Sequence, residues 1–166
     1  MTGRDLTQRQ HRAWAAYHRM QGLLGSQLNR RLIQETGLSE ADYEILAALQ
    51  GAEDHRLRAL ALRCAVQWEK SRLSHHLARM QRRGLVLRED CVEDSRGAVY
   101  RLTEAGRTAV AAAQSSRTEA VRTYLVGLLT AEQLDALADI SDAILRRLAE
   151  ESDHRHALEE LARGTS

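Results

Sequence analysis

The sequence predicts a mainly α-helical fold that carries one small β-hairpin. Proline is absent and aromatic residues make up only 4% of the 166 residues, which favours a helix-rich chain. Apolar residues recur at helical spacing in several segments, as they do in amphipathic helices. Two short apolar runs, Leu85–Leu87 and Val99–Leu102, flank a polar segment that contains glycine. This last pattern predicts a hairpin.

The first fifty residues predict two helices. A long helix is expected from Leu6 to Glu35, because Trp14, Tyr17, Leu24, Leu28 and Leu32 recur at spacings of three, four and seven. Gly37 would end this helix in the left-handed conformation. Ser39 then matches an N-cap, with Asp42 as the acidic partner of a capping box. The inner face of the second helix would be lined by Tyr43, Leu46 and Leu49.

The middle of the chain predicts a helix-turn-helix. Leu57 is expected in a lone strand, and Ala59, Leu62 and Val66 form the apolar stripe of a short helix. The turn follows through Gln67, with Trp68 packed under it. A second helix then has Leu73, Leu77 and Met80 on its apolar side, and Gly84 closes it.

The other side of this second helix is short-polar and basic. From residue 68 to 88 the cations are Lys70, Arg72, Arg79, Arg82, Arg83 and Arg88, against the single acid Glu69. The net charge of the whole chain is only +1, because the C-terminal part is acidic. A helix with an apolar back and a basic front suits a helix that lies on nucleic acid.

The hairpin follows the basic helix directly, and Arg96 and Gly97 would lie near its tip. A basic-tipped hairpin after a helix-turn-helix is the pattern of a winged helix-turn-helix domain. In such a domain the helix contacts bases in the major groove and a wing arginine enters the adjacent minor groove.

The motifs of this region resemble those of the MarR family of bacterial transcription regulators. D-S-R at 94–96, followed by L-T at 102–103 and Gly106, is similar to the family's D-x-R…L-T-x-x-G wing signature. Residues 71–84 and the R-G-L-V that follows from Arg83 are similar to its recognition helix and the exit from that helix. One departure is Gln67, since relatives often have glycine at the turn.

The resemblance implies a homodimeric regulator that binds a pseudo-palindromic operator in double-stranded DNA. Residues 38–103 would be the DNA-binding lobe, residues 1–36 and 104–150 the dimerisation helices, and 151–166 a polar tail. We expect the DNA-binding side chains to be Lys70, Ser71, Arg72, Ser74, His75, His76, Arg79, Arg96 and Gly97, with Asp94 supporting the wing. His76 adjoins the apolar stripe, so a half-buried histidine is the alternative there.

The C-terminal helices carry the remaining apolar stripes. Thr103 caps a helix to about Gly127, and Thr130 with Gln133 caps another, whose apolar face is Leu134, Leu137, Ser141, Ile144 and Leu148. Apolar stripes beyond the needs of one small domain indicate a protein interface. They agree with the expected two-fold dimer.

Relatives commonly bind small aromatic or phenolic anions between the dimerisation helices and the DNA lobes. Trp14, Tyr17, His18 and Tyr43 are on elements that would line such an effector pocket. The alternative is that these side chains are interface and core residues. The sequence names neither an effector nor an operator, and repression is expected only because it is common in the family.

Other function classes find little support in the sequence. No nucleophile elbow, phosphate loop or H-E-x-x-H motif is present, so no enzyme is predicted and no cofactor or metal is expected. A thiol- or metal-responsive sensor, or a protein-interaction module, is the alternative on the same scaffold. Cys64 is expected to be packed, and acidic neighbours would raise the pKa of Cys91. No apolar run approaches the roughly 20 residues of a membrane span, and a cytoplasmic location is expected.

Overall fold

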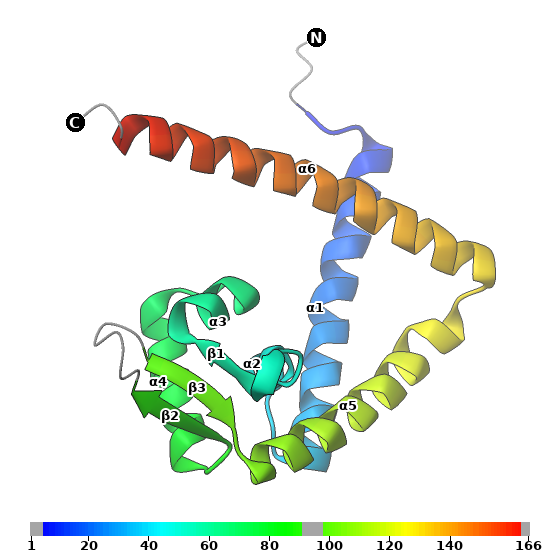
Figure 1. Cartoon of the computed structure of the whole chain (residues 1–166). Helices are drawn as coiled ribbons and strands as arrows, with labels where there is room; N and C mark the ends of the chain where they lie inside the picture. Colours follow the sequence, from blue (N-terminus) through cyan, green and yellow to red (C-terminus); the bar gives the residue numbers. More distant parts are fainter. Residues whose placement is uncertain (1–4, 91–97, 164–166) are drawn as a thin grey trace. The chain divides into compact units, whose positions relative to one another are not determined.

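The computed structural model describes residues 5–90 and 98–163, with the side chains of residue 90 and of residues 152–163 left out of the description. Six α-helices and three strands are found in these residues, joined in places by short 3-10 turns (Figure 1). The chain divides into two units, Met1–Arg122 and Thr123–Ser166, which are described separately. None of the described helices has the length and apolar character of a membrane span.

Two capped helices open the first unit. α1 runs from Gln8 to Thr36 behind a Thr7–Gln10 capping box, and Gly37 ends it with φ of 69°. α2 runs from Glu40 to Gln50, and the predicted capping box of Ser39 and Asp42 is present. The Ser39 hydroxyl accepts a hydrogen bond from the Asp42 backbone N–H, while the carboxylate of Asp42 accepts one from the Ser39 backbone N–H.

The helix-turn-helix consists of α3, Ala59–Val66, and α4, Lys70–Arg82. Gln67 takes the left-handed conformation between them, with φ of 53° and ψ of 39°, although it has a Cβ atom. Gly84, with φ of 73°, follows α4 as the sequence predicts. The turn therefore has the expected form without the expected glycine.

The predicted wing is a three-stranded antiparallel sheet in the order β1-β3-β2. β2, Val86–Asp90, pairs with β3, Ala98–Leu102, as the hairpin prediction requires. β1, Arg56–Arg58, pairs with β3 on its other side, so Leu57 lies opposite Tyr100 as the lone strand that the sequence predicts. Leu87 lies opposite Arg101, which fixes the register of the hairpin.

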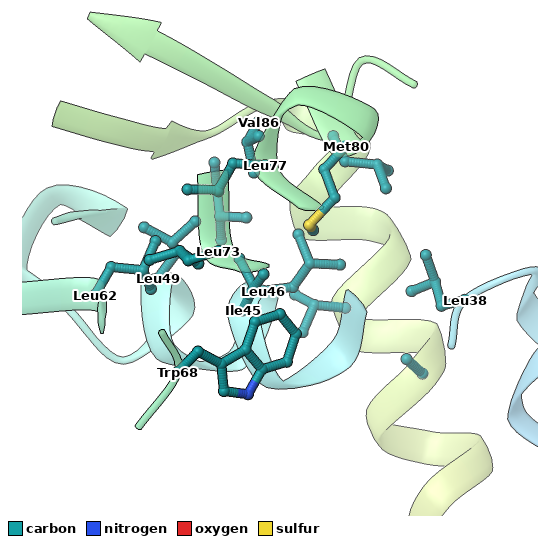
Figure 2. Close-up of a cluster of buried hydrophobic side chains, with 14 of the residues drawn as sticks. Leu38, Ile45, Leu46, Leu49, Leu62, Trp68, Leu73, Leu77, Met80 and Val86 are labelled. Carbon is teal, nitrogen blue, oxygen red and sulfur yellow. The ribbon is translucent and has the colours of Figure 1, made fainter. Parts of the chain in front are cut away.

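The core of the first unit lies where α2, α3, α4 and the sheet meet, and Figure 2 shows many of its side chains. The predicted stripe of α4 is buried, with Leu73, Leu77 and Met80 no more than 3% exposed. Other buried members are Leu32, Leu38, Ile45, Leu46, Leu49, Leu62, Trp68, Leu85, Val86, Leu102, Val110 and Ala113. Because α4 buries one whole side in this core, its opposite side faces outward.

The C-terminal helices differ from the prediction at two boundaries. α5 runs from Glu104 to Tyr124 rather than to Gly127, and a short 3-10 turn, Val126–Leu128, follows it. α6 begins at Ala131 behind the predicted Thr130–Gln133 capping box, but its backbone stays helical to Arg163. The segment after residue 150 has no glycine or proline before Gly164 and is rich in good helix formers, so its polarity does not end the helix.

Candidate nucleic-acid interface

The outward side of α4 carries the charged and short-polar residues that the sequence singles out. Its exposed members are Lys70, Ser71, Arg72, Ser74, His75 and Arg79. They alternate with the buried side chains of Leu73, Leu77 and Met80, as the helical period requires. Hydroxyl, imidazole and guanidinium groups on one helix face are donors and acceptors of the kind that base edges and phosphates bind.

The first turn of α4 places Arg72 over the indole of Trp68. The Arg72 guanidinium carbon lies 3.8 Å from the centre of the Trp68 ring, which is a cation–π contact. Trp68 is only 7% exposed, so it is a fixed support under the turn, as predicted. Stacking uses the face of a planar guanidinium and leaves the N–H groups at its edge for other partners.

His76 is a correction to the predicted DNA-facing set. His76 is only 8% exposed and lies on the buried side of α4. The Nε2 atom lies 2.9 Å from Oδ1 of Asp42, and the Nδ1 atom lies 2.6 Å from a guanidinium nitrogen of Arg79. The ring of Trp68 meets the His76 ring edge-on at 5.3 Å. The imidazole is therefore engaged inside the lobe, since it lies one helical turn from the buried Leu73 and Met80.

Asp42 is the centre of a polar cluster that sequence reasoning assigned only to the cap of α2. Its Oδ2 atom accepts hydrogen bonds from the Ser39 backbone at 2.9 Å and from Arg83 at 2.9 Å. Arg83 also donates to the Gly37 carbonyl oxygen at 2.9 Å. Burial raises the pKa of Asp42, but the hydrogen bonds from Ser39, Arg83 and His76 outweigh it and the net pKa is lowered. The Asp42 carboxylate therefore stays ionised at neutral pH.

The wing lies beside α4, which contacts β2, and an ion pair joins the two strands of its hairpin. Arg101 of β3 donates to Glu89 of β2 at 2.7 Å, which ties the two strands of the hairpin together. The predicted tip residues Asp94, Arg96 and Gly97, and Cys91 with them, lie outside the described residues.

The four predicted effector residues fall into two groups. Trp14, Tyr17 and His18 lie together on α1, with the Trp14 ring centre 5.9 Å from each of the other two ring centres. Trp14 is 57% exposed in the single chain, so it is not a core residue of this unit. Tyr43 lies on α2 instead, where its ring is 5.1 Å from the Arg117 guanidinium carbon and lines a hollow of about 500 Å³ with α3 residues.

Cys64 is exposed, which contradicts the prediction that its thiol is packed. It follows the fully buried Leu62 by two residues, and two residues turn a helix by about 200°. Cys64 therefore lies on the opposite, exposed face of α3. Among the described residues, no group of three or more histidine, cysteine or acidic side chains is placed to hold a metal ion.

Comparison with known proteins places the chain in a family. No protein-family model and no curated protein sequence matches it. Among solved structures, AbsC, a MarR family transcriptional regulator from Streptomyces coelicolor, is 35% identical, with a TM-score of 0.81 over 89% of this chain and 99% of AbsC. Sco3205, a MarR family transcriptional regulator from the same organism solved in complex with DNA, is 32% identical, with a TM-score of 0.80 over 86% of this chain and 89% of Sco3205.

A mutant of Escherichia coli MarR, solved with operator DNA, shares the fold at 19% identity and a TM-score of 0.71, covering 85% of this chain and 99% of its own. The family motifs of the sequence, the helix-turn-helix with its three-stranded wing, and the two Streptomyces relatives agree. The chain belongs to the MarR family of transcriptional regulators.

Proposed function

We propose that this chain is a transcription regulator that binds a pseudo-palindromic operator in double-stranded DNA as a homodimer. The observation that carries the proposal is the outward face of α4, where Lys70, Arg72 and Arg79 stand above a buried apolar stripe. A family member that is 32% identical, Sco3205, has been solved in complex with DNA. The action on DNA implies a cytoplasmic location.

Each exposed side chain of α4 has a role that follows from its chemistry. Arg72 and its neighbours Ser71, Ser74 and His75 lie in the first turns, where side chains of a recognition helix reach base edges. An arginine that binds guanine through two hydrogen bonds contributes about 1–3 kcal/mol of discrimination. Lys70 and Arg79 are assigned to phosphates, which position the lobe without selecting a sequence.

Arg96 completes the proposed interface from the wing. The family signature assigns it to the minor groove, and Asp94 to the support of the wing turn. The two recognition helices of a dimer would meet half-sites about one helical turn, roughly 10 bp, apart.

Selection of bound duplexes from a random DNA pool tests this function. The expected result is enrichment of an inverted repeat with half-sites about one turn, roughly 10 bp, apart. The enrichment should be lost in Arg72→Ala and Arg96→Ala and kept in Arg122→Ala, which changes an exposed cation on α5. Absence of any enrichment would favour the alternative of a protein-interaction module on the same scaffold.

Ligand response is the second part of the proposal. We propose that a small aromatic or phenolic anion shifts the spacing of the two DNA lobes and so releases the operator. We propose repression rather than activation because repression is common in the family. The exposed ring cluster of Trp14, Tyr17 and His18 supports an aromatic partner. Tyr43 is kept as a separate candidate beside Arg117. Titration with such anions should weaken binding to the selected duplex, and an unchanged affinity would contradict this part alone.

A further inference from the structure

A buried polar bridge joins the recognition helix to the beginning of α2. His76 on α4 contacts Asp42, which caps α2, and Arg83 at the end of α4 contacts the same carboxylate. Arg83 also reaches the Gly37 carbonyl oxygen at the end of α1. The bridge therefore fixes the orientation of α4 relative to the α1–α2 junction through a single carboxylate.

The partners of His76 allow only one form of its ring. Arginine has N–H donors and no acceptor, so Nδ1 of His76 must accept the hydrogen bond of 2.6 Å from Arg79. Ionised Asp42 has acceptors and no donor, so Nε2 must donate across 2.9 Å. Both contacts require the neutral imidazole that carries its proton on Nε2. A proton on Nδ1 would leave two donors facing each other, the Nδ1–H group of His76 and the N–H group of Arg79, and the hydrogen bond between these residues would be lost.

The bridge ends at a side chain of the proposed DNA surface. Arg79 is exposed, yet one of its guanidinium nitrogens is held by a ring that is itself buried and fixed by Asp42. A long arginine side chain loses much rotamer freedom when it binds a phosphate. A guanidinium that is already held in one orientation loses less of that freedom. It therefore binds a phosphate more strongly than a freely rotating guanidinium that makes the same contact.

We propose that His76 is a positioning residue for DNA binding. Its Nε2–H group is fixed by Asp42, and its Nδ1 atom holds Arg79 in the orientation that contacts the DNA backbone. The inference rests on the proposed function, because Arg79 acts only if α4 lies on DNA. His76 itself touches no DNA.

Two substitutions of His76 by amide side chains test the hydrogen bonds of its two ring nitrogens one at a time. Glutamine places its amide group where Nε2 lies, so His76→Gln keeps a donor for Asp42 and loses the acceptor for Arg79. Asparagine places its amide oxygen near the position of Nδ1, so His76→Asn keeps an acceptor for Arg79 and loses the Asp42 contact. Binding of the full-length variants is measured on a labelled random-sequence duplex, because phosphate contacts do not depend on sequence.

The expected result is coupling between His76 and Arg79. Arg79→Ala should weaken binding about ten-fold and lower the salt slope by about one. His76→Gln should weaken binding about three- to ten-fold while the protein unfolds at the wild-type urea concentration, and His76→Asn should restore part of the affinity. In the His76→Gln background, Arg79→Ala should add only the remainder of the ten-fold loss, which is about three-fold at most. His11→Gln on α1 is the control, because its side chain is exposed outside this bridge.

Two outcomes would overturn the inference. If Arg79→Ala weakens binding equally in both backgrounds, His76 does not position Arg79, although the proposed function stands. If the wild-type protein binds no duplex at low salt, the proposed function fails and the inference fails with it. ¹⁵N NMR of the His76 ring in the free protein gives a check without substitutions: a proton on Nε2 alone is expected, and a proton on Nδ1 at neutral pH contradicts the proposal.

Discussion

Asp42 connects local helix capping to long-range order. The same carboxylate accepts hydrogen bonds from the N-cap Ser39, from His76 and from Arg83, which is 41 residues further along the chain. Burial of a carboxylate is unfavourable when it is alone and is offset here by charged and backbone donors. The residue therefore stabilises the lobe only while it is ionised.

This dependence gives a prediction for acid. The folded-state pKa of Asp42 is lowered, so its contribution is fully present above the unfolded-state pKa of about 3.9 and is lost as pH falls through the folded-state pKa. Asp42→Asn should lower the free energy of unfolding by about 2 kcal/mol at neutral pH. Urea denaturation should show this difference shrinking as the pH falls below about 3.9. A difference that is the same at neutral and acid pH would show that the charge of Asp42 is unimportant.

At the same scale, sequence reasoning found the exposed face of α4 but misplaced two residues. Helical periodicity separates Ser71, Arg72 and Arg79 from the buried stripe, and this separation is seen in the structure. His76 lies at the edge of that stripe, where the period alone does not decide exposure, and its partner Asp42 is 34 residues away. Cys64 was predictable, because its spacing from Leu62 already indicates the exposed side of α3.

Among the elements, the junction between the wing and α5 depends on a close backbone approach. A Cβ atom on Gly106 would lie 2.1 Å from the carbonyl oxygen of Leu85. The same oxygen accepts a hydrogen bond from the Thr103 backbone N–H at 3.2 Å, and Thr103 in turn caps α5 by accepting from Gly106. Glycine at this position allows the helix to start against the strand.

Gly106→Ala should therefore destabilise the protein by about 3 kcal/mol, because the obstructing atom belongs to the backbone and cannot move aside cheaply. Gly51→Ala is the matched control, with φ of −78° and a nearest contact of 3.6 Å, and should change stability by no more than about 0.5 kcal/mol. Thermal denaturation of both variants gives the comparison. Equal stabilities would mean that the approach of α5 to Leu85 is not needed.

Most elements were predictable because their signals are local. Capping boxes at Ser39 and Thr130, glycine after α1 and α4, and the polar turn between two apolar runs all act within a few residues. The departures have equally physical causes. Gln67 adopts the left-handed turn because burial of Leu62 and Trp68, on either side of it, in the core overrides its preference. α6 continues beyond residue 150 because that segment is rich in glutamate, arginine, alanine and leucine, which are good helix formers.

For the whole molecule, two helices leave apolar side chains uncovered in the single chain. On α6, the residues Ile140, Ile144, Leu145 and Leu148 are all at least 50% exposed. On α1, Met20, Leu23 and Ile33 are at least 41% exposed. Apolar side chains exposed along a helix are unfavourable in water, and association of two copies would bury them.

Ile144→Glu should therefore weaken the proposed dimer, because a carboxylate would be buried twice across a two-fold interface. An increase of at least about 100-fold in the dimer dissociation constant is expected. Asp142→Lys lies about 200° away around α6 and should leave the dimer intact. Sedimentation of both variants, with helix content checked by circular dichroism, measures this effect. A dimer that tolerates glutamate at residue 144 would place the interface elsewhere.

The most direct measurement of the central proposal is equilibrium binding of the full chain to a duplex that carries the selected inverted repeat, titrated at several salt concentrations. The predicted result is two protomers per duplex, with the logarithm of the binding constant falling linearly with the logarithm of salt concentration, by about 0.9 for each phosphate contact. A scrambled duplex should bind at least about 1,000-fold more weakly. No binding at low salt, or equal binding to both duplexes, would contradict the proposal that α4 and the wing recognise a DNA sequence.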